Sequence, residues 1–180
     1  MSENGRLDNK TEYQIDKTRE GGEYSTPSLV TNETIQDIEG QLALFGTDVD
    51  LRTFSPLALA FLGDAVYSLI IRTSVIARGN RQAEKLHNET TRLVRAQKQA
   101  AIGRAVYDLL TPEEQKVYRR GRNSHPMHHA KGASLDEYLQ ATALETLCGY
   151  LYLQGRTERL MEILRTGLEL TSRRNGQPLL

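Results

Sequence analysis

The feature that most constrains the fold is an apolar run from Pro56 to about Ala77 that contains one carboxylate, Asp64. Ser55 followed by Pro56 is a helix start, with serine at the N-cap and proline at the first helical position. The run is predicted to be one helix that ends before Gly79. Because it is apolar on nearly every face, we expect it to be the central, buried helix.

Apolar periodicity and helix punctuation predict helices along the rest of the chain as well. Thr111 with Glu114, and Ser134 with Glu137, form two capping-box patterns, each of which opens a helix. No stretch alternates apolar and polar residues as a strand does, so the predicted fold class is all-α. Besides the first run, the predicted helices cover about 34–45, 82–109 as one helix or an interrupted one, 111–121, 134–154 and 158–170.

Asp64 and Glu145 are the carboxylates that attract attention, because each lies in a strongly apolar helix with no Lys or Arg one turn away. Burying an ionised carboxylate without a partner is costly. For each acid alone, the ordinary interpretation is a core carboxylate paired with a distant arginine. If the two helices pack together, however, the two acids can share a cation. Mg²⁺ suits such a site, because it takes oxygen ligands and often uses only one or two protein carboxylates.

The distribution of charge suggests a polyanion as a partner, although the net charge is zero. Residues 1–50 contain 4 Lys/Arg and 11 Asp/Glu, a balance of −7, whereas residues 72–131 contain 13 and 5, a balance of +8. A basic middle with an acidic arm is typical of proteins that bind nucleic acid. The alternative is a solvated helix surface joined to a disordered tail.

The expected organisation is an acidic, disordered N-terminal arm over residues 1–33, one helical domain over 34–172 and a frayed end over 173–180. The start has no apolar leader, and no run of 18 apolar residues indicates a membrane span. Cys148 is the single cysteine, which excludes an intramolecular disulfide. We therefore expect a reduced, cytoplasmic protein without a membrane partner.

Two separated motifs resemble those of the ribonuclease III family. Phe61–Val66 (FLGDAV) resembles the family signature, and Glu145–Gly149 (ETLCG) resembles its second acidic motif. The chain is more similar still to the short Mini-ribonuclease III branch, which lacks a double-stranded RNA-binding domain. That closer resemblance covers about residues 55–164 and rests on Leu57–Ala60 (LALA), Leu86-His87, Val94–Gln97 (VRAQ), Gln99-Ala100 and Arg120–Asn123 (RGRN).

The resemblance implies a ribonuclease III-type helical bundle that acts as a homodimer on double-stranded or structured RNA. It implies Asp64 and Glu145 as catalytic residues and Mg²⁺ ligands. Leu57, Ala60 and Thr142 stand where the full-length family has further acids, which leaves open how many Mg²⁺ ions bind. The implied reaction is metal-assisted phosphodiester hydrolysis that matures the 5′ and 3′ ends of the 23S ribosomal RNA precursor, with a ribosomal protein as a candidate stimulator. The alternative is a non-catalytic module that binds structured RNA or the ribosome.

The basic loop 119–131 is the best candidate for RNA contact, because arginine forks bind phosphates in a bidentate manner. The alternative is an ordinary basic surface loop. A zinc site in this loop is disfavoured, because the adjacent His128 and His129, with His125 nearby, match no structural zinc spacing. The candidate RNA contacts are Arg120, Arg122, Asn123 and Lys131, with Arg95 and Lys98 as further candidates on the preceding helix.

Overall fold

A computed structural model describes residues 50–124 and 132–174 of the chain. All of these residues belong to one compact unit, and none of them is in a strand, so the all-α prediction is confirmed for them. The predicted arm 1–33 and helix 34–45, the three loop histidines, Lys131 and the last residues 175–180 lie outside the described part. The domain boundaries therefore stay predictions.

The helices begin close to where the sequence predicts, because their caps are formed as expected. The Ser55 Oγ accepts a hydrogen bond from the Ala58 backbone N at 3.1 Å, and both capping boxes are complete. The predicted stretch 82–109 is interrupted at Arg95, whose extended backbone ends one helix and starts the next. The elements are η1 (Leu51–Thr53), α2 (Pro56–Ile76), α3 (Ala83–Val94), α4 (Ala96–Val106), η2 (Tyr107–Leu109), α5 (Pro112–Arg122), α6 (Leu135–Leu153) and α7 (Thr157–Arg174).

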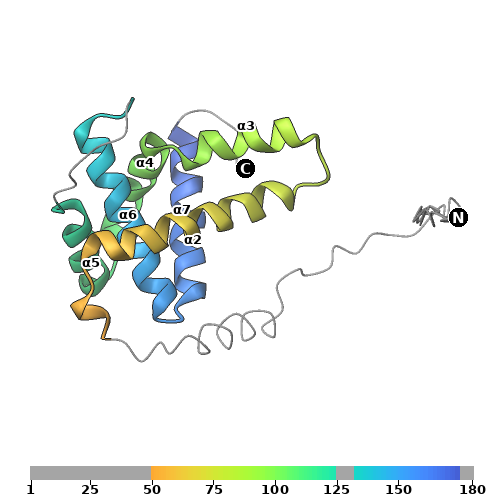
Figure 1. Cartoon of the computed structure of the whole chain (residues 1–180). Helices are drawn as coiled ribbons and strands as arrows, with labels where there is room; N and C mark the ends of the chain where they lie inside the picture. Colours follow the sequence, from red (N-terminus) through yellow and green to blue (C-terminus); the bar gives the residue numbers. More distant parts are fainter. Residues whose placement is uncertain (1–49, 125–131, 175–180) are drawn as a thin grey trace, which may run out of the picture. The chain divides into compact units, whose positions relative to one another are not determined.

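The centre of the bundle is α6, so the expectation that the helix starting at Pro56 would be central is wrong. Figure 1 shows α2 (orange to yellow-green) running across α6 (cyan to blue), and α4, α5 and α7 also pack on α6. From Gln140 to Leu151 every residue of α6 except Glu145 is buried. In contrast, α2 leaves large apolar side chains exposed: Phe61 is 86% exposed, Leu69 63% and Ile76 60%. The apolar composition of α2 and α6 predicted that both are helices of the core. It did not predict which of the two is surrounded by other helices on all sides.

Helix α2 is also long and apolar enough to cross a membrane by length and composition alone. One such helix is weak evidence, because core helices pass the same test, and 39% of its most apolar stretch is buried within the bundle. The expectation of no membrane partner stays a prediction.

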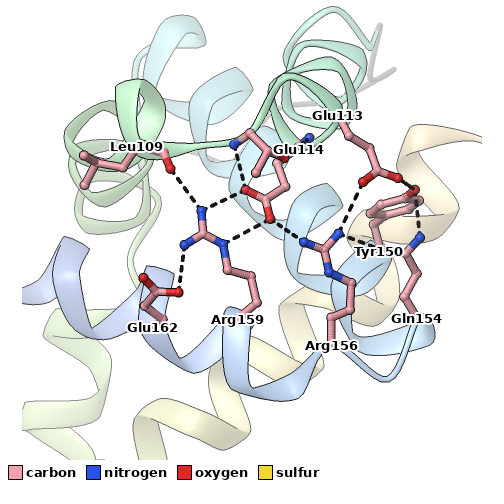
Figure 2. Close-up of polar contacts among 9 residues, drawn as sticks. Leu109, Glu113, Glu114, Tyr150, Gln154, Arg156, Arg159 and Glu162 are labelled. Atoms are coloured by element: carbon pink, nitrogen blue, oxygen red, sulfur yellow. Dashed lines mark hydrogen bonds and ion pairs between the residues drawn. The ribbon is translucent and has the colours of Figure 1, made fainter.

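A buried carboxylate joins the start of α5 to the start of α7 (Figure 2). Glu114 is fully buried and accepts hydrogen bonds from Arg156 Nη2 at 2.8 Å and from Arg159 Nη2 at 3.0 Å. Its capping-box bond from the Thr111 backbone N measures 2.9 Å. Burial raises the pKa of Glu114, but these hydrogen bonds and the two nearby positive charges outweigh burial and hold the pKa below its usual value.

Candidate active site

Helices α2 and α6 approach each other so closely that two glycines are required at the contact. A Cβ added to Gly63 would lie 1.8 Å from the carbonyl oxygen of Glu145, and one added to Gly149 would lie 2.1 Å from that of Leu59. Neither position can hold a larger residue unless the helix backbones separate. This contact places Asp64, the residue after Gly63, beside the α6 turn that carries Glu145.

Asp64 and Glu145 line one open groove of about 520 Å³ between α2 and α6. The structure thus brings together two acids that are 81 residues apart in the sequence. The other groove residues are apolar or uncharged: Leu57, Ala60, Phe61, Leu62 and Ala65 from α2, and Tyr138 and Thr142 from α6.

The two acids differ in their exposure to solvent. Asp64 is exposed, so the expectation that both apolar helices bury their acid is wrong for α2. Asp64 lies on the same side of α2 as Phe61, which points away from the core, and the cost of burial that the sequence suggested does not arise. Glu145 is partly buried, as an acid on the central helix is expected to be.

The surroundings of Glu145 favour its protonated form. Burial and, to a smaller degree, the negative charge of Asp64 raise the pKa of Glu145 to about 8, and the Gln99 side chain partly opposes the rise. No ion pair to either acid is formed within residues 50–124 and 132–174. Near neutral pH and without a cation, Glu145 therefore retains a proton that a cation in the groove would displace.

The donor set of the groove fits a hard divalent cation such as Mg²⁺. Two carboxylates face an open space large enough for a phosphate group and water, and Mg²⁺ often uses one or two carboxylates together with substrate phosphates. In the described part of the chain no group of three or more His, Cys, Asp or Glu residues could hold a metal. Leu57, Ala60 and Thr142 also line the groove. The three positions at which the full-length family is expected to have further acids therefore lie beside Asp64 and Glu145 in this fold.

Three of the predicted RNA contacts are exposed. Arg122 and Asn123 lie at the end of α5, and the Arg122 guanidinium lies 3.6 Å from an exposed carboxylate, that of Asp136 in the first turn of α6. Arg95 lies at the corner between α3 and α4. Two residues after it, the Gln97 Nε2 donates to the carbonyl oxygen of Gly132 at 2.6 Å. This bond holds Gly132, three residues before α6, against the start of α4.

Two other predicted contacts have partners within the fold. The Arg120 Nη2 donates to the Phe54 carbonyl oxygen at 2.9 Å, which ties α5 to η1. The Lys98 Nζ donates to the Thr171 Oγ1 at 2.7 Å, and burial lowers the pKa of this amine. As RNA contacts both stay predictions, as does Lys131, which lies outside the described residues.

Gln99 is a buried polar residue of α4 that the sequence did not single out as a site residue. Its signals in the sequence are its position within the apolar stripe of that helix and its place in the Gln99-Ala100 pair that resembles the Mini-ribonuclease III branch. Tyr138 is a groove residue that the sequence also did not single out; an aromatic residue near a helix start is too common to stand out.

Comparison with known proteins identifies the family. Residues 57–156, which span both acids, match the ribonuclease III domain. The chain is 42% identical over 148 residues to a protein named Mini-ribonuclease 3 from Thermoanaerobacter sp. (strain X514), covering 82% of this chain and 97% of that one. The chain belongs to the Mini-ribonuclease 3 family. Another Mini-ribonuclease 3, from Clostridium tetani (strain Massachusetts / E88), is 42% identical and covers 69% of this chain and 83% of its own.

A solved structure supports the same assignment. The crystal structure of a protein from Fusobacterium nucleatum superposes with a TM-score of 0.61 at 32% identity, covering 65% of this chain and 95% of that one. The resemblance drawn from the two acidic motifs is therefore confirmed. As a member of this family, the chain is an endoribonuclease that acts on structured RNA.

Proposed function

We propose that this chain is a Mg²⁺-dependent endoribonuclease that works as a homodimer and matures both ends of the 23S ribosomal RNA precursor in the cytoplasm. The observation that carries the metal assignment is the meeting of Asp64 and Glu145 in one open groove. The assignment of the 23S ribosomal RNA precursor as the substrate rests on the resemblance to the Mini-ribonuclease III branch. A ribosomal protein is a candidate stimulator on the same ground.

In this proposal Asp64 and Glu145 hold Mg²⁺ through their carboxylate oxygens. When bound, Mg²⁺ supplies an activated water and offsets negative charge on the scissile phosphate. Glu145, whose pKa burial raises, would release its proton on becoming a ligand.

The proposed RNA surface runs from the α3–α4 corner to the end of α5. Arg122 lies beside Asp136, which precedes Glu145 by nine residues on α6 and hence by about 14 Å along the helix axis. A-form RNA is recognised through phosphates and 2′-hydroxyls rather than bases. Arg95, Arg122 and Asn123 are the exposed residues that can make such contacts.

The proposed dimer forms through the exposed apolar side of α2. Phe61 is 86% exposed and lies four residues after Leu57, which is 41% exposed. Four-residue spacing places both on one side of the helix, which is also the side of Asp64. A second copy docked there would cover apolar surface that the described part of a single chain leaves in water, and would bring its own groove close by.

The decisive experiment measures cleavage of duplex RNA, and of a 23S precursor fragment, with and without Mg²⁺. Asp64→Asn and Glu145→Gln each remove a ligand charge, so we expect cleavage to fall by about 100-fold or more. The helical circular dichroism signal and RNA affinity measured with EDTA should stay near wild type. Wild-type cleavage rates in both variants would refute the metal site.

Arg122→Ala serves as the matched variant of the RNA surface in the same assay. Loss of one phosphate contact should weaken RNA binding and lower the slope of log affinity against log salt by about 1. Its dependence on Mg²⁺ should equal that of the wild type, since Arg122 does not line the groove. An unchanged salt slope would remove Arg122 from the RNA surface.

A further inference from the structure

Tyr138 lines the same groove as the two acids, and the proposed reaction does not yet use it. It lies on α6 seven residues before Glu145, which is about 10 Å along the helix axis. Residues spaced by four and then three positions share one side of a helix, so Tyr138, Thr142 and Glu145 line the groove from one side of α6. Asp64 lines it from α2.

Among the described residues, the Tyr138 hydroxyl is the free hydrogen-bond donor of this groove. Of the residues that line it, none is a lysine or arginine, and only Tyr138 and Thr142 carry a hydroxyl. The Thr142 Oγ1 donates its hydrogen within its own helix, to the Tyr138 carbonyl oxygen at 3.0 Å. Within residues 50–124 and 132–174 the Tyr138 hydroxyl forms no hydrogen bond, whereas the hydroxyls of four other tyrosines do: Tyr67, Tyr107, Tyr118 and Tyr150.

We propose that Tyr138 is a substrate-binding residue whose hydroxyl donates a hydrogen bond to a phosphate oxygen of the RNA strand that enters the groove. The inference rests on the proposed function, since it takes the strand to be cleaved at Asp64 and Glu145. Phosphate oxygens accept hydrogen bonds, and carboxylates that serve as metal ligands have no hydrogen to donate to them. A hydroxyl meets this need, and its bond to an ionised acceptor is stronger than one between neutral groups.

The position of Tyr138 along α6 assigns this bond to a phosphate beside the scissile one. The scissile phosphate must lie at the two acids, whereas Tyr138 is two turns of α6 away from Glu145. Side chains of an α-helix lean toward its N-terminus, which is the direction away from Glu145. Tyr138 therefore binds and aligns the strand and takes no part in proton transfer.

Tyr138→Phe tests this role, because it removes only the hydroxyl and keeps the ring. Tyr152→Phe is the matched control, since Tyr152 is also a partly buried tyrosine of α6 but does not line the groove. We expect Tyr138→Phe to lower kcat/KM for duplex RNA by about 10-fold at saturating Mg²⁺, and Tyr152→Phe to leave it unchanged. The Mg²⁺ concentration for half-maximal cleavage should equal that of the wild type in both variants.

A binding measurement without cleavage separates this inference from the proposed function. Asp64→Asn removes an acid of the site and with it a negative charge that repels phosphate. In EDTA, we expect the double variant Asp64→Asn/Tyr138→Phe to bind duplex RNA about 10-fold more weakly than Asp64→Asn, as measured by fluorescence anisotropy. Asp64→Asn/Tyr152→Phe should bind as Asp64→Asn does.

The possible outcomes are distinct. Unchanged kcat/KM and affinity in the Tyr138→Phe variants, or an equal loss in the Tyr152→Phe variants, would overturn the role of Tyr138 and leave the two-acid site standing. A lower melting temperature of Tyr138→Phe would place the hydroxyl's bond within the fold, and a weaker dimer in sedimentation equilibrium would place it against a second copy; either result overturns the role. Wild-type cleavage by Asp64→Asn would instead refute the proposed function.

Discussion

Glu145 shows how strongly one residue's properties depend on its neighbours. Its residue type alone predicts an ordinary carboxyl pKa. Burial and the negative charge of Asp64 raise the pKa of Glu145 to about 8. The same carboxyl group on the surface would be ionised at neutral pH. Two acids in one groove therefore favour binding of a cation, because the positive charge offsets the repulsion between the two carboxylates.

This raised pKa predicts an unusual dependence of stability on pH. Between the ordinary pKa of 4.5 and about 8, folded Glu145 keeps a proton that the unfolded chain releases. The free energy of unfolding of the metal-free protein should therefore fall as the pH rises through this interval. Urea unfolding in EDTA at several pH values within the interval measures the effect.

Glu145→Gln is the control for that prediction, because glutamine packs similarly and does not titrate. The variant should lose the fall in stability between pH 4.5 and 8. An equal pH dependence in wild type and variant would show that Glu145 titrates normally. At the upper end of this pH interval, Mg²⁺ should raise the free energy of unfolding of the wild type but not that of the variant.

At the level of helices, polar groups at helix ends set how the elements meet. Glu114 completes the α5 capping box and also binds Arg156, just before α7, and Arg159 in the first turn of α7, so one side chain fixes the start of two helices (Figure 2). The α3–α4 corner is likewise bound by Tyr67 and Gln99. Such contacts orient the helices around α6, and with them the groove.

Glu114→Gln should destabilise the protein by about 2–4 kcal/mol, since it leaves two arginines without their buried anion. The lower end is expected, because Arg156 and Arg159 are themselves 34% and 24% exposed and water screens them. Urea or thermal unfolding at neutral pH measures the loss. Glu158→Gln, a change at an exposed acid of α7, is the control and should alter stability little.

The pH dependence supplies a second check on Glu114. Its pKa lies below the ordinary value of 4.5, so its stabilising effect is complete above that pH and is lost as the pH falls through the lower, folded value. Glu114→Gln should therefore show a shallower loss of stability in acid than the wild type. Parallel acid unfolding curves would contradict the role assigned to this ion pair.

At the scale of the whole molecule, some arginines of the basic segment 72–131 form ion pairs within the fold. Arg78 and Arg81 both pair with Glu89, and Arg104 and Arg122 both pair with Asp136. Four of the 13 basic residues between positions 72 and 131 are thus partly neutralised. Glu89 is already counted in the balance of +8, so only the pairs with Asp136, which lies outside these positions, lower the excess positive charge of this segment.

The exposed side of α2 predicts the oligomeric state. Phe61→Glu places a charge in the middle of the proposed interface, so we expect the dissociation constant of the dimer to rise by about 10-fold or more. Sedimentation equilibrium of the full chain over a range of concentrations measures it. Leu109→Glu, at an apolar residue of η2 that is 54% exposed, is the control and should leave the dimer unchanged. An intact dimer in Phe61→Glu would exclude this side of α2.

The sequence by itself determined the helical class, the starts of the capped helices and the two acids that the fold brings into one groove. These follow from local chemistry: Ser55, Thr111 and Ser134 cap the helices that immediately follow them, and such patterns act within one turn. The two acidic motifs were also sufficient to indicate the family, which the comparisons confirm.

Only the tertiary structure decided that α6 rather than α2 is central, that Asp64 is exposed, and that Lys98 and Arg120 bind other parts of the fold. It alone showed that Gln99 is buried. The reason is that burial and pairing depend on which helices surround a residue, and those contacts join positions tens of residues apart. Periodicity shows that a helix side is apolar, but not whether a neighbouring helix or a second chain will cover it.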